Sequence, residues 1–326
     1  MRPELAEIYG DPVLGPRFEK ALGSPHWETA ISARSIRPDR WKIRIRKFKP
    51  SRRVSFTVEI PSRNGSERSR FLVKVWHSPR GESIRERLEL INSSLDREAK
   101  ACLRIPSPLF YDSEAHALAY RWMPGVPLSR RLRQGDPSNW IDSVAKALSF
   151  LHQLSLPDLP QRSPLDEIDA VTRSLDPDTP EAFRADLSIR ILDPLLASPP
   201  KLARQVSLHR DLYDQQALLT GKGPVTLIDL DDMARGDPML DVGNLMAHLH
   251  LIEKVDGGLL DVTRIEKKFL KAYAIHAGLE LGSIGGPYLW YKTVSLARLA
   301  ALQLKKRNRK MSRRLFLLAE RARKSL

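Results

Sequence analysis

The sequence lacks several features that would each assign it to a class of protein. It holds a single cysteine, Cys102, so no disulfide bond can form within the chain. No apolar run approaches the about eighteen residues that a membrane span needs, and no long apolar segment follows the first ten residues. We therefore expect no signal peptide, no membrane contact and a reducing, cytoplasmic setting. Internal repeats and low-complexity tracts are also absent, which excludes solenoid and linker-like chains.

Acidic residues are too few to balance the basic ones, and the formal net charge is +15. The excess is concentrated in two clusters, residues 34–53 and 305–324, each with ten Lys or Arg and one acid. Such clusters can attract nucleic acid or another polyanion. A solvated basic face is the commoner interpretation of the same pattern, and the sequence leaves both open.

Hydrophobic periodicity divides the 326 residues into a β-rich part and a helical part. Residues 41–47, 54–60 and 70–76 alternate between apolar and polar side chains, which predicts an antiparallel meander of at least three strands. Apolar residues from Ile84 to Cys102 recur at helical spacing and predict one helix. Two short strands and a Pro-Gly turn at 124–125 follow, and helical patterns then dominate. The pattern predicts a small β-rich lobe over 1–123 and a larger helical lobe over 124–326.

Two short segments place carboxylates where phosphoryl transfer needs them. The first, HRDLYDQQ, spans 209–216 and holds Asp211 and Gln216; the second, VTLID, ends at Asp229. A hairpin between them would bring the two aspartates to one site. One carboxylate could then orient the attacking hydroxyl, while the other, with an amide oxygen, could hold Mg²⁺ against the phosphates.

These segments resemble the aminoglycoside phosphotransferase family. Its members have a protein-kinase-like fold, in the α+β class, with a small antiparallel β-rich lobe and a larger helical lobe. Protein kinases carry His-Arg-Asp-Leu-x-x-x-Asn and then Asp-Phe-Gly; here the motifs read HRDLYDQQ and LIDLDDMARGDPMLDVGNL. The resemblance implies Asp211 as catalytic base, Mg²⁺ on Asp229 and Gln216, and Gln216 in place of the usual Asn.

Three further motif residues receive roles from the same resemblance. His209 would support the loop, Asp241 would buttress it from the next helix, and Asp231 would assist the metal or contact substrate. Two other aspartates, Asp214 and Asp232, we interpret as solvated or capping groups.

The nucleotide would be held by residues of the first lobe. Lys74 on the third strand would contact the α- and β-phosphates, with Glu98 as its partner. No glycine-rich loop joins the first two strands, so Arg52 and Arg53 are candidates to meet phosphate oxygens instead. In YRWMPGVPL, Trp122 and Met123 would form the hinge that binds the purine. Arg121 stands where the family often has an acid, which leaves ATP or GTP open.

We therefore predict a Mg²⁺- and ATP-dependent phosphotransferase acting on a hydroxyl of a small molecule. Gln216 and the missing glycines also admit a non-catalytic, nucleotide-binding pseudokinase. The two basic clusters admit a polyanion or nucleic-acid binder. The sequence does not indicate the acceptor or the oligomeric state.

Overall fold

A computed structural model of the chain describes residues 3–30, 41–61, 68–134, 138–201, 204–221, 223–255, 257–258 and 260–326. Within these ranges the chain forms two compact units. The first combines Met1–Ser94 with Ile105–Pro124, and the second combines Leu95–Arg104 with Gly125–Leu326. The first seven residues of the basic cluster 34–53 lie outside the described residues.

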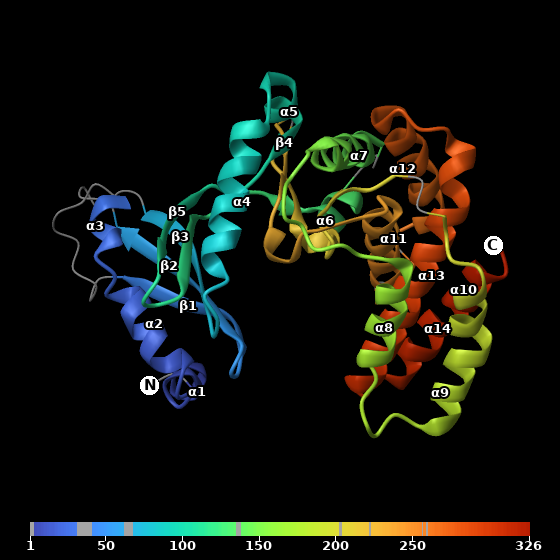
Figure 1. Cartoon of the computed structure of the whole chain (residues 1–326), viewed down its shortest axis with the longest axis horizontal. Coiled ribbons are helices and arrows are strands. Elements are labelled where there is room, and N and C mark those ends of the chain that lie inside the picture. The colour runs from blue at the N-terminus through green and yellow to red at the C-terminus, as the bar shows by residue number, and fades with distance from the viewer. Residues whose placement is uncertain are drawn as a thin grey trace. The chain divides into compact units, whose positions relative to one another are not determined.

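The first unit is built on a five-stranded antiparallel sheet whose strand order is β1-β2-β3-β6-β5 (Figure 1). The strands are β1 Lys42–Lys49, β2 Arg53–Pro61, β3 Arg68–Trp76, β5 Pro108–Asp112 and β6 Ala117–Arg121. The alternating sequence over β1 to β3 predicts this meander, and the prediction is confirmed. The register places Lys74 between Ser55 on β2 and Leu118 on β6.

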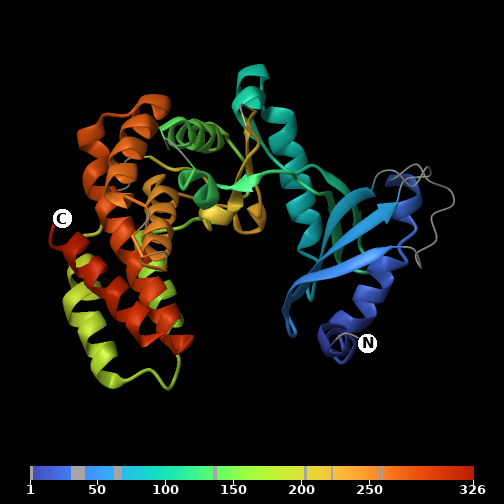
Figure 2. The ribbon, with the colours of Figure 1, turned by 180° about the vertical axis from the view of Figure 1, so that it is seen from behind.

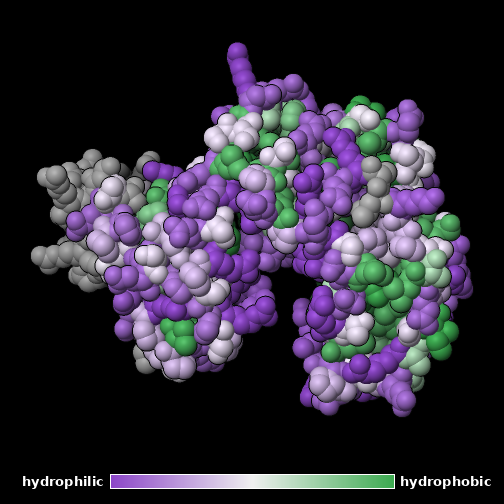
Figure 3. All heavy atoms as spheres, viewed as in Figure 1, coloured by the Kyte–Doolittle hydropathy of each residue, from purple (hydrophilic) through white to green (hydrophobic). Residues whose placement is uncertain are grey.

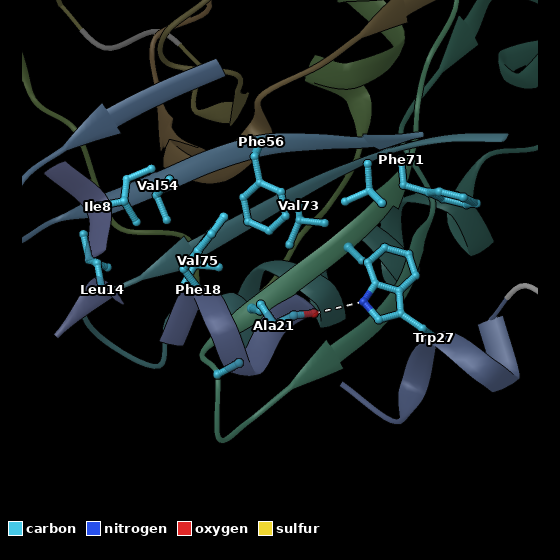
Figure 4. Packing of buried hydrophobic residues seen from close by; sticks show 14 of the residues in the cluster. Ile8, Leu14, Phe18, Ala21, Trp27, Val54, Phe56, Phe71, Val73 and Val75 are labelled. Carbon is cyan, nitrogen blue, oxygen red and sulfur yellow. Dashed lines mark hydrogen bonds between the residues drawn. The ribbon is translucent and has the colours of Figure 1, made fainter. Parts of the chain in front are cut away.

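Three short helices, α1 (Pro3–Tyr9), α2 (Leu14–Leu22) and α3 (His26–Ala30), supply the other half of the core of the first unit. Figure 4 shows the side chains of these helices directed at apolar side chains of β2 and β3. Phe18 meets Phe56 edge-to-face with 4.8 Å between ring centroids. The indole N–H of Trp27 donates to the Ala21 carbonyl at 2.9 Å, so a buried polar atom is satisfied within the cluster.

The helix predicted from Ile84 to Cys102 is wrong as a single element. Helix α4 covers Gly81–Ser94, and a separate short helix, α5, covers Arg97–Cys102. The break comes at Asp96, whose extended backbone and side chain cap α5 by accepting from Ala99 N at 2.8 Å. Aspartate is a strong N-cap residue, so a new helix begins after Asp96 although apolar residues continue at helical spacing.

The second unit is mainly helical, as the helical patterns in this part of the sequence predict (Figures 1 and 2). Its α-helices are α6 Leu128–Leu132, α7 Ser138–Gln153, α8 Pro164–Arg173, α9 Glu181–Leu187, α10 Asp193–Ala197, α11 Met239–Val255, α12 Val262–Ala277, α13 Leu281–Lys305 and α14 Arg309–Arg323. Helix α13 packs against α11 and α14, and α12 packs against α7. Gly243 permits the α11–α13 approach, because a Cβ there would lie 2.6 Å from Lys292 N.

Two small sheets interrupt these helices and carry the two motifs that hold Asp211 and Asp229. One has the order β4-β10-β9-β7, and the other pairs β11 with β8. Their strands are β4 Leu103–Arg104, β7 Val126–Pro127, β8 Val206–Leu208, β9 Ala217–Leu219, β10 Val225–Leu227 and β11 Ala234–Gly236. The hairpin of β9 and β10 confirms the pairing predicted for the segments around Gln216 and Asp229.

The visible surface of both units is mostly hydrophilic, with a green apolar patch on the helices of the second unit (Figure 3). Most basic side chains of β1 and of α14 are exposed. No helix among the described residues is long and apolar enough to cross a membrane.

Candidate active site

The HRDL motif forms a loop that leaves β8 and is fastened at both ends. Strand β8 pairs with β11 before the loop, and the 3-10 helix Asp214–Gln216 follows it. The side chain of His209 is fully buried, and its Nε2 lies 2.9 Å from the carbonyl oxygen of Ile228, immediately before Asp229. The structural role expected for His209 is confirmed, because this side chain ties the loop of Asp211 to the segment of Asp229.

Asp241 at the start of α11 holds the backbone of the same loop. Its Oδ2 accepts from His209 N and its Oδ1 from Arg210 N, both at 2.7 Å. This confirms the prediction that Asp241 buttresses the loop. Arg210 has φ 73°, a backbone conformation that non-glycine residues seldom adopt and that surrounding contacts must hold.

A histidine from α7 completes the surroundings of Asp241. His152 Nε2 lies 3.0 Å from Asp241 Oδ2, and His152 Nδ1 lies 2.7 Å from the Tyr273 hydroxyl. Burial raises the pKa of Tyr273, so its hydroxyl keeps its proton. A carboxylate oxygen only accepts, so the Nε2–H of His152 donates to Asp241 Oδ2. Asp241 then accepts from three donors, and His152 joins α7 and α12 to the HRDL loop.

Asp211 is half-buried at the centre of this loop. Burial raises the pKa of its carboxyl, and the neighbouring charges of Asp229 and Asp232 act in the same direction. Arg298 and His209 oppose this rise. A carboxylate that is partly desolvated yet faces a cation can remain ionised and still accept a proton well, which is what a general base requires.

Arg298 on α13 also belongs to this site, although no sequence motif marks it. Its guanidinium donates to Asn244 Oδ1 at 2.8 Å, and Asn244 Nδ2 donates to the carbonyl of Leu212 at 2.8 Å. This chain of hydrogen bonds connects α13, α11 and the residue that follows Asp211. The motif itself ends on α11, and no signal in the sequence of α13 marks Arg298.

Gln216 and Asp229 lie together, with 3.4 Å between Gln216 Nε2 and Asp229 Oδ2. The carbonyl of Gln216 also accepts from Ile228 N at 3.0 Å, which aligns the two segments. Asp229 has φ 65° and ψ 47°, the left-handed conformation in which aspartate is enriched. Gln216 Oε1 is buried and has no hydrogen-bond partner among the described residues.

The other aspartates of the motifs differ in their surroundings. Asp214 is not a solvated group, which corrects the interpretation from the sequence: it is buried and accepts from Ser129 Oγ and from Gln215 Nε2. Ser129 on α6 could not be paired with it from the sequence because the two lie 85 positions apart. Asp231 is buried, whereas Asp232 is exposed as expected.

Asp237 precedes α11 and is buried beside the site. Its Oδ1 accepts from Met239 N at 2.8 Å, but burial outweighs this bond and raises the pKa of Asp237 from 3.8 to about 6. The folded protein therefore binds this proton more tightly than the unfolded chain does. Its contribution to the free energy of unfolding consequently falls as the pH rises from about 4 to about 6.

Asp237→Asn is therefore expected to stabilise the protein at pH 7.5 by about 1–3 kcal/mol and to change little at pH 4.5. The amide oxygen can still accept from Met239 N, while the buried charge is removed. Urea unfolding of both proteins at the two pH values measures the difference. An equal difference at both pH values would show that the ionisation of Asp237 does not cause it, and a loss of stability at pH 7.5 alone would show that the ionised carboxylate is needed.

The residues expected to bind the nucleotide lie mainly in the first unit. Lys74 is buried on β3, and its Nζ lies 5.6 Å from the centroid of the Tyr120 ring, so it is not the surface lysine that β3 could have carried. Arg52 N donates to Lys49 O at 3.1 Å in the β1–β2 turn, and Arg53 begins β2.

Trp122 and Met123, which the sequence predicts as the hinge, follow β6 and are half-buried. Trp122 N donates to Arg70 O at 2.9 Å, which continues the β3–β6 pairing by one residue. The guanidinium carbons of Arg46 and Arg70 lie 5.6 and 5.3 Å from the centroid of the Trp122 ring. Cation–π contact thus fixes the orientation of this indole.

Glu98 belongs to the second unit, on α5. Its side chain is 70% exposed and forms an ion pair with Lys146 of α7 at 3.4 Å. The prediction that Glu98 faces inward assumed a continuous helix through residue 98. The break at Asp96 removes that assumption, and Lys146 is the partner that the structure shows for Glu98.

Comparison with known proteins identifies the relationship. The profile of the phosphotransferase enzyme family matches residues 62–274, more than half of the sequence. The chain belongs to this family. The match includes Lys74, Asp211, Gln216 and Asp229 and stops before Arg298. No curated protein sequence matches the chain.

Solved structures similar to the phosphotransferase chain have low sequence identity but nearly complete coverage. A choline kinase from Streptococcus pneumoniae is 16% identical, with 95% of this chain and 99% of that chain covered and a TM-score of 0.59. An ethanolamine kinase from Plasmodium vivax is 11% identical, with 98% and 95% covered and a TM-score of 0.61. Aminoglycoside 2'-phosphotransferase-IIIa, solved with GDP, is 14% identical, with 94% and 99% covered and a TM-score of 0.59.

These findings confirm three predictions from the sequence. The family, the protein-kinase-like fold and a phosphotransferase of the small-molecule kinase class are as the motifs indicated. The structures with the same fold include complexes with GDP and AMP, which supports nucleotide binding as a property of this fold.

Proposed function

We propose that the chain transfers the γ-phosphate of ATP to a hydroxyl group of a small molecule, with Asp211 orienting and deprotonating that hydroxyl. The observation that carries the proposal is the position of Asp211. It is half-buried on a loop held by the three donors to Asp241, and its charge is coupled to that of Asp229. The family supports the class of reaction, because its members are phosphotransferases.

The protein contributes position and electrostatics in this proposal. Asp211 accepts the hydroxyl proton on a carboxylate oxygen as the acceptor oxygen attacks the γ-phosphorus and the bond to the leaving ADP oxygen breaks. The fixed loop keeps the acceptor in line without reorganisation, which lowers the barrier through orientation and preorganised charge. The buttress from Asp241 and His152 preserves this geometry.

The donors present at Asp229 and Gln216 fit a hard divalent cation such as Mg²⁺. Carboxylate and amide oxygens are its preferred protein ligands, and Gln216 Oε1 is a buried oxygen without a partner among the described residues. A half-turn of the amide exchanges its oxygen and nitrogen, so this oxygen is available beside Asp229 Oδ2. Bound Mg²⁺ would supply charge neutralisation on the β- and γ-phosphates.

Lys74, Arg52 and Arg53 are the proposed ligands of the nucleotide phosphates, and Trp122 and Met123 are the proposed purine-binding hinge. We retain the pairing of Lys74 with Glu98 as a prediction, with Lys146 as the competing partner of Glu98. ATP is the proposed donor, and GTP is the alternative that a nucleotide competition experiment distinguishes.

An acceptor screen tests the proposed function. The wild type is incubated with Mg²⁺ and ATP and with sugars, amino alcohols, nucleosides, sugar phosphates or antibiotics, and ADP formation is measured, with Asp211→Asn as the blank. We expect acceptor-dependent ADP formation by the wild type alone. Tight nucleotide binding without turnover on any acceptor would instead indicate a pseudokinase.

Gln216→Leu tests the amide as a metal ligand. The substitution removes the buried, unpartnered oxygen, so we expect unchanged or higher stability. The Mg²⁺ concentration that half-saturates ADP binding is expected to rise by about tenfold, as for other losses from a metal site. Calorimetric ADP titration at a series of Mg²⁺ concentrations measures the shift, and Gln215→Leu, at the exposed neighbouring position, is the control. The same Mg²⁺ midpoint in the wild type and in Gln216→Leu would rule out ligation by this residue.

A further inference from the structure

Three arginines from three different segments gather beside Asp211 in the second unit. Arg162 precedes α8, Arg210 lies in the catalytic loop and Arg298 lies on α13. One glutamate, Glu167 on α8, faces them: Arg162 NH2 lies 2.8 Å and Arg210 NH2 lies 3.8 Å from Glu167 Oε1. Arg298 has no carboxylate within ion-pair distance across the described ranges, and it donates to the neutral amide of Asn244 instead.

Chain position or hydrogen bonds connect each of the three arginines to the segment that holds Asp211. Arg210 is the residue before Asp211, and Arg298 is linked through Asn244 to the carbonyl of Leu212, the residue after it. Arg162 N donates to Arg235 O at 2.8 Å, which joins it to β11 and so to the strand that leads into the loop. A ligand that approaches Asp211 on the side of these arginines therefore meets guanidinium groups.

The cluster remains accessible. The side chains of Arg162 and Arg210 are 17% and 22% exposed, and Arg298 and Asp211 are half-buried. Partly desolvated guanidinium groups with free N–H donors bind phosphate and carboxylate oxygens through charge-assisted, often bidentate, hydrogen bonds. Such sites interact much more strongly than the exposed lysines of a surface patch.

A neighbouring aromatic pair, Tyr213 and His248, contributes no charge to the surroundings of Asp211. The His248 ring stacks on the Tyr213 ring with 4.9 Å between centroids. Burial, with the charges of Arg298 and Lys306 acting in the same direction, lowers the pKa of His248 to about 3. His248 is therefore neutral, so it neither adds to nor cancels the cationic surroundings of Asp211.

We propose that the arginine cluster Arg162–Arg210–Arg298 is the acceptor subsite and that it selects a hydroxyl compound carrying an anionic group, such as a phosphate or carboxylate. The proposal rests on the proposed function, because it places the acceptor hydroxyl at Asp211. Asp166 and Glu167 form ion pairs with Arg162 or Arg210 but not with Arg298, so an acceptor without a negative charge would leave the donors of Arg298 unused. The anionic group satisfies those donors while the hydroxyl reaches Asp211.

The transferred phosphoryl group is the other anion that could meet Arg298, and the experiment separates the two. The probes are D-glucose 6-phosphate, D-glucose and D-glucosamine, which share a ring with free hydroxyls and differ in charge. Binding to the full chain is measured by calorimetry with ADP and Mg²⁺ present, so that the nucleotide site is occupied. Binding does not require turnover, so its outcome is independent of the acceptor screen that tests the proposed function.

We expect D-glucose 6-phosphate to bind at least about tenfold more tightly than the other two probes. Arg298→Gln should remove this preference, whereas Arg313→Gln, an exposed arginine on α14, should keep it. Arg298→Lys is the second variant, to be used if Arg298→Gln folds poorly. It keeps the charge but not the planar donors, so it should retain only part of the preference. Thermal unfolding of each variant shows whether it is folded.

Three results would overturn the proposal. The first is tighter binding of D-glucose or D-glucosamine than of D-glucose 6-phosphate. The second is an unchanged preference in a folded Arg298→Gln variant, and the third is no binding of D-glucose 6-phosphate at millimolar concentration. If probe binding is unchanged but Arg298→Gln lowers turnover equally on every acceptor, Arg298 serves the phosphoryl group instead.

Discussion

Replacing Asp211 with Asn is expected to lower kcat by about 10³-fold, within the range that general bases contribute. The amide has nearly the same shape and can still accept a hydrogen bond, but it cannot take the proton of the acceptor hydroxyl. Binding of ADP should be unchanged, because the residues proposed for the nucleotide lie elsewhere. Steady-state kinetics and calorimetric ADP titration of the same protein preparation measure both quantities.

The matched control for this variant is Asp232→Asn. Asp232 is the exposed aspartate of the second motif, and it contributes to the raised pKa of Asp211 only through its charge. We expect its kcat to stay within about threefold of the wild type, as for most surface substitutions. A kcat for Asp211→Asn within tenfold of the wild type would remove Asp211 from the reaction.

Asp241→Asn is expected to lower the free energy of unfolding by about 3 kcal/mol and kcat by about 10²-fold. The fully buried carboxylate accepts from two backbone N–H groups and from His152. In the variant one oxygen becomes an NH₂ group that must face a donor. The loop then loses at least one of its fixed bonds, and Asp211 is displaced. Urea unfolding and steady-state kinetics measure the two effects.

An exposed Asp–His pair in the same unit provides the control for Asp241. Asp142 Oδ1 lies 2.9 Å from His276 Nε2, a distance like that of the buried pair, but its side chain is 60% exposed. Asp142→Asn should change stability by less than about 0.5 kcal/mol and leave kcat unaltered. Equal effects of the two substitutions would contradict the buttress role of Asp241.

The sequence predicts those parts of the fold whose side chains repeat with a regular period. The alternation over β1 to β3 requires one face of each strand to be buried, and the long helices of the second unit bury apolar stripes. Strands β8 and β11 have three residues each, which is too short for periodicity to be visible. They are set by pairing with each other, a contact between distant segments that no local pattern carries.

The site shows the same division between local and distant information. Spacing and a hairpin predict the loop of Asp211 and the proximity of Gln216 to Asp229, and the family resemblance predicts the buttress Asp241. Arg298 could not be predicted, since it reaches the site only through the packing of α13 on α11. The burial of Asp214 could not be predicted for a similar reason, because its partner Ser129 belongs to another segment, helix α6.

The break between helices α4 and α5 at Asp96 is marked by a local signal, the capping aspartate. Apolar residues continue at helical spacing from α4 into α5, so the pattern alone indicates one helix. The cap at Asp96 is nevertheless written in the sequence, as an aspartate followed three residues later by Ala99, whose N–H it binds. This cap places Glu98 on α5 and not on α4.

The most direct test of the proposed function is the chemical structure of the product. Phosphorus NMR of the reaction of ATP with the best acceptor from the screen, together with Mg²⁺, identifies the atom that receives the phosphate. We predict a phosphate monoester on a hydroxyl oxygen of the acceptor, formed by the wild type and not by Asp211→Asn. Inorganic phosphate as the only product, or the same ester formed at the same rate by Asp211→Asn, would contradict the assignment.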